Sequence, residues 1–138
     1  MEIPKDVLPK LWDAARQAQA KAYAPYSRFP VGAALWDEDG NIYAGCNIEN
    51  AAYPQGWCAE ATAIGALVMA GGKRIRGVLV VGTGGSWITP CGGCRQKLRE
   101  FADLKTPIVS ASTTELGPIH TLEQLLPHSF GPDHLKSV

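Results

Sequence analysis

Hydrophobic residues near the N-terminus recur at steps of three and four along the chain. They are Val7, Leu8, Leu11, Ala15, Ala18 and Ala22. Because this spacing places side chains on one face of a helix, it predicts a helix over about residues 5–22. Pro9 is compatible with this helix, since the N–H that proline lacks has no intrahelical partner in the first turn. The two prolines of "APYSRFP", residues 24–30, end it.

Four later segments have the hydrophobic pattern of β-strands. The runs "VGAALWD" (31–37) and "NIYAGCNI" (41–48) are short and β-compatible, and the "EDG" between them indicates a hairpin. The apolar run "RGVLVVGT" (76–83) is typical of a buried strand, and "TPIVSAS" (106–112) predicts a further strand.

Three more helices are expected after the first. They cover residues 57–70, the segment "TPCGGCRQKLREFA" (89–102) and the short run "TLEQLL" (121–126). Gly71 and Gly72 end the first of these. In the second, Thr89 is placed to cap the helix and Pro90 to occupy its first position. This order of helices and strands predicts a mixed α/β sandwich in which helices cover a sheet.

Composition and charge restrict the kind of protein. The 138 residues are 46% hydrophobic and 19% charged, which suggests one folded domain over residues 1–138. Thirteen basic and thirteen acidic residues cancel, so the basic excess of a nucleic-acid-binding protein is absent and a small uncharged ligand suits the chain better. The N-terminal segment lacks the apolar region of a secretory signal, and no apolar run has the length of a membrane span. We therefore expect a cytoplasmic protein with reduced thiols.

Three of the four cysteines have the spacing of a metal site. Thirty-two residues lie between Cys58 and the motif Cys91-Gly92-Gly93-Cys94, and both segments are expected to begin helices. The free N–H groups and partial positive charge of a helix N-terminus favour the thiolate form that binds metal. Three protein ligands with an open fourth position are typical of catalytic zinc, whereas structural zinc usually has four.

Glu60 lies two residues after the first of these thiols. Residues two apart in a helix are rotated by about 200°, so Glu60 and Cys58 can face one site only if Cys58 lies in the very first turn. A carboxylate beside a zinc-bound water can take its proton and pass it on, which is general acid–base catalysis.

Other interpretations of these residues remain open on spacing alone. Cys91 and Cys94 could form a redox pair, although that gives Cys58 and Glu60 no role. All three thiols could form a closed structural site with Cys46, although Cys46 lies in a strand-like run and resembles a small core residue. Glu60 could simply complement its helix dipole. The combined spacing favours the catalytic interpretation.

Several motifs together resemble a known family. They are "YAPYSRFPVGAAL", "GCNIENAAY", "CAEATAI", "PCGGCRQKLREF" and "LLPHSFGP". From about residue 20 to 135 the chain resembles cytidine deaminase of the small homotetrameric type, within the cytidine and deoxycytidylate deaminase superfamily. The resemblance implies a three-layer α/β/α sandwich with a mixed sheet of about five strands. It also implies one zinc ion per chain and a homotetramer with active sites at subunit interfaces.

The resemblance implies specific roles for the chemical residues. Cys58, Cys91 and Cys94 would bind zinc, and Glu60 would shuttle protons. Glu60 would deprotonate the zinc-bound water, protonate N3 of the pyrimidine as hydroxide attacks C4, and then pass the proton to the departing amino group. The products would be uridine and ammonia.

The resemblance also implies contacts to the nucleoside. Asn47 and Glu49 match an N-x-E pair that hydrogen-bonds the ribose 3′-hydroxyl, and Phe29 matches an aromatic residue that lies against the substrate. The Ala59 N–H and the Thr89 carbonyl resemble the contacts to the base edge.

Two further aromatic residues resemble parts of the same site. Phe130 resembles a residue that a neighbouring subunit contributes over the base, and Tyr53 is similar in position to a tyrosine near the site. The three histidines, at positions 120, 128 and 134, lie outside every motif and are not expected to be ligands.

Ala61 is where the chain departs from the family pattern, which usually has arginine directly after the glutamate. Three thiolates on Zn²⁺ leave a net charge of −1, which that arginine helps to compensate. Arg95 is a possible substitute cation in this sequence. We therefore expect either a less electrophilic zinc or another residue that supplies the charge.

The expected function is zinc-dependent hydrolytic deamination of cytidine and 2′-deoxycytidine in pyrimidine salvage. One alternative is deamination of a related aminopyrimidine nucleoside, such as a nucleoside antibiotic. From a different class, the chain could be a non-catalytic binding module stabilised by zinc.

Overall fold

The structure is a computed structural model that describes residues 2–136. Its described part contains one five-stranded sheet with the strand order β2-β1-β3-β4-β5. The strands are β1 (Gly32–Asp37), β2 (Ile42–Cys46), β3 (Ile75–Val81), β4 (Pro107–Ala111) and β5 (Leu116–Thr121). Only β3 and β4 pair in parallel, while the other neighbours are antiparallel. The expected mixed sheet of about five strands is confirmed.

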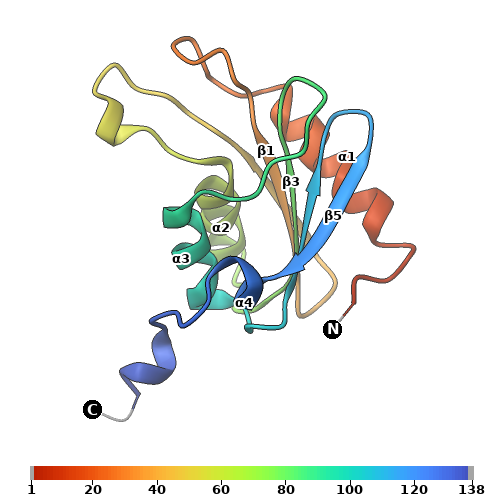
Figure 1. Cartoon of the computed structure of the whole chain (residues 1–138), viewed down its shortest axis with the longest axis vertical. Coiled ribbons are helices and arrows are strands. Elements are labelled where there is room, and N and C mark those ends of the chain that lie inside the picture. Colours follow the sequence, from red (N-terminus) through yellow and green to blue (C-terminus); the bar gives the residue numbers. More distant parts are fainter. Residues whose placement is uncertain (1, 137–138) are drawn as a thin grey trace.

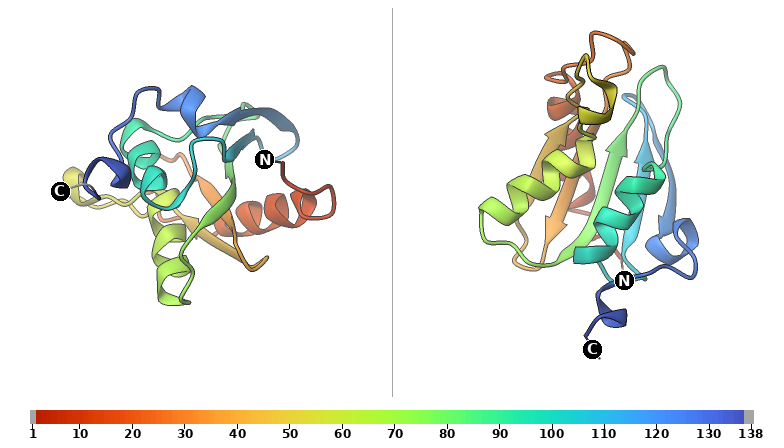
Figure 2. Two further views of the ribbon diagram at one scale, coloured as in Figure 1. Left: turned by 90° about the horizontal axis from the view of Figure 1, so that it is seen from below. Right: turned by 90° about the vertical axis from the view of Figure 1, so that its left-hand side faces the viewer.

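Helices cover both faces of this sheet (Figures 1 and 2). They are α1 (Leu8–Gln19), α2 (Ala59–Met69), α3 (Gly92–Phe101) and α4 (Leu122–Leu125), with two short 3₁₀ turns at Tyr53–Gln55 and Pro132–His134. Helix α1 packs on one face, and the other three helices lie on the opposite face. The result is the three-layer α/β/α sandwich that the family resemblance implies.

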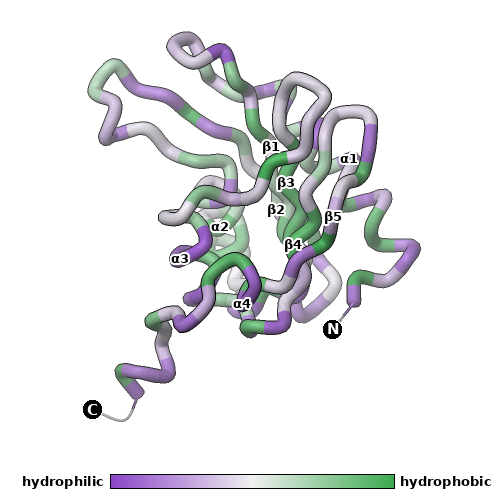
Figure 3. Tube along the Cα trace, in the orientation of Figure 1, coloured by the Kyte–Doolittle hydropathy of each residue, from purple (hydrophilic) through white to green (hydrophobic). Residues whose placement is uncertain are grey.

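The core follows from the alternation of side chains along the buried strands. In β3, Val78 and Val80 point into the cluster beneath α2 and α3, whereas Leu79 and Val81 point into the cluster beneath α1. Because both faces of this strand are covered, its sequence is continuously apolar. Figure 3 shows the hydrophobic positions concentrated in these central strands.

One glycine allows a close approach that fixes the position of α2. A Cβ atom on Gly45 of β2 would lie 2.4 Å from the backbone nitrogen of Ala63, so only glycine permits this contact between strand and helix. The Thr62 hydroxyl adds a hydrogen bond of 2.9 Å to the carbonyl of Cys46. The N-terminus of α2 is thereby held at a defined place beside the sheet.

The starts of two helices differ from the sequence-based expectation. Helix α2 begins at Ala59 because Cys58 has an extended backbone and forms the N-cap. The expectation that Thr89 caps α3 and Pro90 opens it is wrong, because Cys91 is the N-cap and the helix begins at Gly92. The Thr89 hydroxyl instead accepts a hydrogen bond of 2.8 Å from the Arg95 guanidinium.

The helix predicted for residues 5–22 is shorter in the structure, running from Leu8 to Gln19. Directly after it, Tyr23 donates its backbone N–H to the carbonyl of Asn47, which draws the chain alongside the end of β2. Among the described residues, no helix has both the length and the apolar character needed to cross a membrane.

Candidate active site

Three cysteine thiols converge where α2 and α3 begin. Cys58 is the N-cap of α2, Cys91 is the N-cap of α3, and Cys94 lies in the first turn of α3. Their sulfur atoms all lie within 4.8 Å of one another, and the Sγ atoms of Cys58 and Cys91 are 3.9 Å apart. Two sulfurs on one tetrahedral zinc, each about 2.3 Å from the metal, would be about 3.8 Å apart. The thiol group therefore fits a single zinc ion.

The surroundings of the thiols differ, and so do their pKa values. Burial raises the pKa of Cys94, and the nearby acidic groups Glu60, Cys58 and Cys91 raise it further. Burial also raises the pKa of Cys58. At Cys91 burial acts in the same direction, but hydrogen bonds from Cys94 and Cys58 outweigh it and lower the pKa. A bound cation would have to displace protons from these thiols.

Glu60 lies in the first turn of α2 with only 4% of its surface exposed. Burial raises the pKa of this carboxyl group above its ordinary value, and hydrogen bonds to its own backbone and to Cys94 oppose the rise only in part. The positive charge of the Lys97 ammonium also lowers the pKa of Glu60. A raised pKa makes a carboxylate a stronger base, which suits Glu60 to accept a proton and pass it on.

The first turn of α2 also offers backbone donors. In an α-helix the first N–H groups have no intrahelical acceptor, and Ala59 is the first residue of this helix. Its side chain is buried, with 1% exposed. Along the chain this donor comes directly after the N-cap residue Cys58 and directly before Glu60.

Comparison with known proteins agrees with this geometry. A family model described as "Cytidine and deoxycytidylate deaminase zinc-binding region" matches residues 6–110, a span that contains all three thiols and Glu60. The chain belongs to the cytidine and deoxycytidylate deaminase family. Its cofactor is zinc, and it is an enzyme of the deaminase class.

Individual relatives are similar over most of their length. The cytidine deaminase of Sporosarcina psychrophila is 43% identical over 128 residues, which cover 91% of this chain and 93% of the relative. The cytidine deaminase of Mycobacterium tuberculosis is 42% identical over 123 residues, covering 88% and 87%. Among solved structures, the cytidine deaminase of Burkholderia pseudomallei has a TM-score of 0.84 at 39% identity, covering 89% of this chain and 98% of that one.

Asn47 and Glu49 hold the loop that carries Phe29. The Asn47 side chain accepts from the Val31 N–H at 2.8 Å and donates to the Phe29 carbonyl at 3.0 Å. Glu49 accepts hydrogen bonds from both the backbone N–H and the hydroxyl of Ser27, which lower the pKa of its carboxyl group. Sequence reasoning missed Ser27, for which the available signal was a hydroxyl inside the proline-bounded loop.

Tyr53 and Glu49 lie at an open cavity of about 330 Å³. The cavity is lined by Tyr26, Ser27, Glu49, Asn50, Tyr53 and Gly56. The rings of Tyr26 and Tyr53 meet edge to face with centroids 5.8 Å apart, and Tyr53 is 74% exposed. Neither the thiols nor Glu60 line this cavity.

Arg95 is not directed at the thiols, contrary to one of the options raised by the sequence. Its guanidinium donates to the Pro90 carbonyl at 2.7 Å, to the Leu125 carbonyl at 2.7 Å and to the Thr89 hydroxyl. Arg95 therefore braces the segment that leads into Cys91 and fixes the orientation of Thr89.

Phe130 is the remaining aromatic residue assigned to the site. It belongs to the C-terminal arm, residues 128–134, which packs on α3 and leaves its ring 58% exposed. The arm leaves the fold at the end opposite to the loop of residues 47–57 (Figures 1 and 2).

The remaining polar candidates lie apart from the thiols. Cys46 is half-buried at the end of β2 and is not part of the thiol group. Among residues 2–136, the thiol group contains no histidine.

Ala61 provides a test of charge compensation at this site. It is buried, with 6% exposed, directly after Glu60 in α2. We expect Ala61→Arg to raise turnover at unchanged zinc content, because a guanidinium would offset the negative charge of three thiolates. Overpacking should cost about 1–3 kcal/mol of folding free energy. Ala61→Met, which adds bulk without charge, is the matched control, and kcat, zinc content and urea unfolding are the measurements. A rate no higher than that of the parent enzyme would show that Ala61 does not limit turnover.

Proposed function

We propose that this protein catalyses the hydrolytic deamination of cytidine and 2′-deoxycytidine to uridine and 2′-deoxyuridine, with release of ammonia, and that it serves pyrimidine salvage. The observation that carries the proposal is the convergence of three thiols at two helix N-termini beside the buried carboxyl group of Glu60. The relatives named above are called cytidine deaminases.

In this proposal Cys58, Cys91 and Cys94 hold one zinc ion. When bound, zinc supplies Lewis-acid activation of the attacking water at neutral pH. Glu60 takes a proton from that water and delivers one to N3 of the pyrimidine as C4 becomes tetrahedral. Glu60 then takes the proton of the new C4 hydroxyl and delivers it to the exocyclic amino group, so that the C4–N bond breaks, the C4 carbonyl forms and ammonia leaves. The raised pKa of Glu60 suits both directions of transfer.

Other residues orient the nucleoside in the same proposal. The Ala59 N–H and the Thr89 carbonyl contact the base edge, and Arg95 fixes the orientation of the threonine. Phe29 lies against the substrate, held in place by Asn47.

The sugar is bound at the neighbouring cavity. Asn47 and Glu49 contact the ribose 3′-hydroxyl, and Tyr53 lies beside them. Binding would exchange some of the hydrogen bonds that these two polar side chains now make to residues 26–31 for bonds to the sugar.

We further propose that the enzyme is a cytoplasmic homotetramer of single-domain subunits with active sites at the subunit interfaces. The aromatic side chains of Tyr26, Tyr53, Trp57 and Phe130 are between 49% and 74% exposed in one chain, an arrangement that suits burial against neighbours. Phe130 would then cover the base bound by an adjacent subunit.

The decisive experiment is ultraviolet absorbance of cytidine with the purified, zinc-loaded protein. We expect conversion to uridine with stoichiometric ammonia. No conversion with one zinc per chain present would overturn the proposal. Activity confined to a modified aminopyrimidine nucleoside would instead favour the nucleoside-antibiotic alternative, and zinc-dependent folding without any turnover would favour a binding module.

A further inference from the structure

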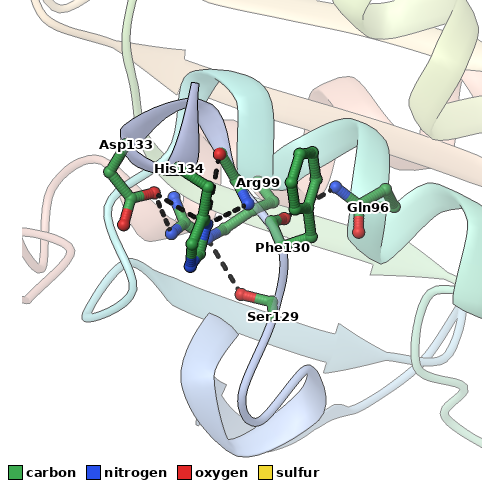
Figure 4. A network of polar contacts seen from close by, with 7 residues as sticks. Gln96, Arg99, Ser129, Phe130, Asp133 and His134 are labelled. Carbon is green, nitrogen blue, oxygen red and sulfur yellow. Dashed lines mark hydrogen bonds and ion pairs between the residues drawn. The ribbon is translucent and has the colours of Figure 1, made fainter. Parts of the chain in front are cut away.

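The C-terminal arm is attached to α3 by three side-chain hydrogen bonds (Figure 4). Gln96 Nε2 donates to the backbone carbonyl of Phe130 at 2.9 Å. Arg99 Nε donates to the Ser129 hydroxyl at 2.9 Å, and Arg99 Nη2 donates to the Asp133 carboxylate at 2.7 Å. The Arg99 side chain is only 10% exposed, so it is pinned between the helix and the arm.

The arm itself is shaped to receive these contacts. A Cβ atom on Gly131 would lie 2.3 Å from Cζ of Arg99, so the guanidinium packs directly on the backbone of this glycine. The Gly131 N–H donates to Nδ1 of His134 at 3.0 Å. The His134 ring stacks on the Phe130 ring with centroids 5.3 Å apart and planes 14° apart. The backbone and the ring of Phe130 are therefore both held in one orientation.

This attachment does not bury the ring that it orients. Phe130 keeps 58% of its surface exposed, although Gln96 and Arg99 of α3 hold the arm and His134 stacks on the ring. The exposed part of this ring buries no apolar surface within its own chain. Because the arm lies at the end of the molecule away from the loop of residues 47–57, a second copy of the chain is the partner that the proposed assembly offers.

We propose that Arg99 and Gln96 are positioning residues, which clasp the arm to α3 so that Phe130 is presented preorganised to the active site of a second copy of this chain. This inference rests on the proposed function, in which Phe130 covers the base bound by a neighbouring subunit. A preordered arm loses little conformational freedom when it docks on a neighbouring subunit. The entropic cost of ordering the arm therefore does not reduce the free energy of substrate binding. Helix α3 also carries Cys91 and Cys94 at its start. One rigid helix therefore connects the metal site of a subunit to the arm that this subunit contributes to its neighbour.

The first test is a double-mutant cycle on the zinc-loaded full chain, with cytidine as substrate. In Arg99→Met, KM should rise about tenfold with kcat nearly unchanged, because contacts made equally in the ground state and the transition state affect KM alone. In a Phe130→Ala background the same Arg99→Met change should shift KM by less than about twofold, since its effect acts through the ring. Equal shifts in both backgrounds, or no shift in either, would overturn the proposal.

Two further variants distinguish the loss of the contacts between Arg99 and the arm from a general effect of removing a positive charge. Arg99→Lys keeps the charge opposite Asp133 but cannot reach the Ser129 hydroxyl at the same time, so its KM should lie between those of the parent and Arg99→Met. Lys10→Met removes a positive charge from α1, on the opposite face of the sheet, and should leave KM and kcat unchanged. A Lys10→Met enzyme with the same KM shift as Arg99→Met would show a general charge effect and overturn the assignment.

The second test observes the arm without reference to catalysis. The chain has only three phenylalanines, so 4-fluorophenylalanine labelling gives three ¹⁹F resonances, and Phe130→Leu identifies the one of interest. Arg99→Met and Gln96→Ala should shift and sharpen the Phe130 resonance while that of Phe29 stays in place. An unchanged Phe130 resonance would refute the clasp whatever the activity. If the parent protein fails to deaminate cytidine, the proposed function fails, whereas the clasp is still decided by this measurement.

Discussion

Replacing Glu60 by glutamine is expected to remove nearly all turnover and to leave the zinc bound. Glutamine keeps the shape of the side chain but cannot take up or deliver a proton, and general acid–base catalysis contributes about 10²–10⁴-fold in rate. Because burial already disfavours the charged form of this carboxyl group, the neutral amide should fold at least as well. The measurements, made on one preparation, are the initial rate of cytidine conversion for turnover, the zinc content for metal binding and the melting temperature for stability.

Glu100→Gln is the matched control for this substitution. Glu100 lies on the exposed side of α3, so the same chemical change there should leave the rate within about twofold of the parent, as surface changes usually do. A Glu60→Gln enzyme that kept a tenth or more of the parent rate would contradict the proton-shuttle role. Zinc loss in that variant would instead show that Glu60 supports the metal site.

Cys94→Ser is expected to abolish both zinc retention and turnover. Cys94 is fully buried, its thiol lies within 4.8 Å of those of Cys58 and Cys91, and serine offers a poor ligand in its place. The parent should gain about 4 kcal/mol of stability when free zinc is a thousandfold above its Kd, and the variant should gain almost none. Zinc-to-chain ratios after dialysis against a chelator, and thermal unfolding with and without zinc, are the measurements.

The pH dependence of zinc binding has a definite sign. Burial raises the pKa of the Cys94 and Cys58 thiols in the metal-free protein, so zinc must displace their protons. Affinity should therefore rise with pH, by about tenfold per unit for each proton displaced, and fall on acidification.

Cys46→Ser is the matched control for Cys94→Ser, because it removes a thiol that is not expected to bind zinc. Cys46 lies at the end of β2 outside the thiol group, so this variant should retain one zinc per chain and the parent rate. If Cys46→Ser lost as much zinc as Cys94→Ser, the result would support the alternative of a closed structural site with four cysteine ligands.

Hydrophobic periodicity was enough to predict most elements of the fold. The three- and four-residue steps that include Leu11 and Ala15 predicted α1, and the continuous apolar run around Val78 predicted a strand buried on both faces. Both predictions succeed because burial of apolar surface is the dominant local constraint on these segments. The start of α3 was predicted wrongly, because Arg95 and Thr89 form a side-chain contact across six residues that propensities at the cap do not encode.

The candidate site, like the fold, could be predicted from the sequence only in part. The sequence by itself determined the chemical types and their spacing: three thiols and a carboxylate at the starts of two helices, within motifs specific enough to indicate the family. It could not determine that the Sγ atoms meet within 4.8 Å, because Cys58 and Cys91 are brought together only by the packing of α2 and α3 on one sheet. Tertiary structure alone also decided that Arg95 braces a loop instead of facing the thiols, and that Arg99 reaches Asp133 across 34 residues. The physical reason is that periodicity and capping act over a few residues, whereas the direction of a long polar side chain is set by acceptors that only the folded chain brings near.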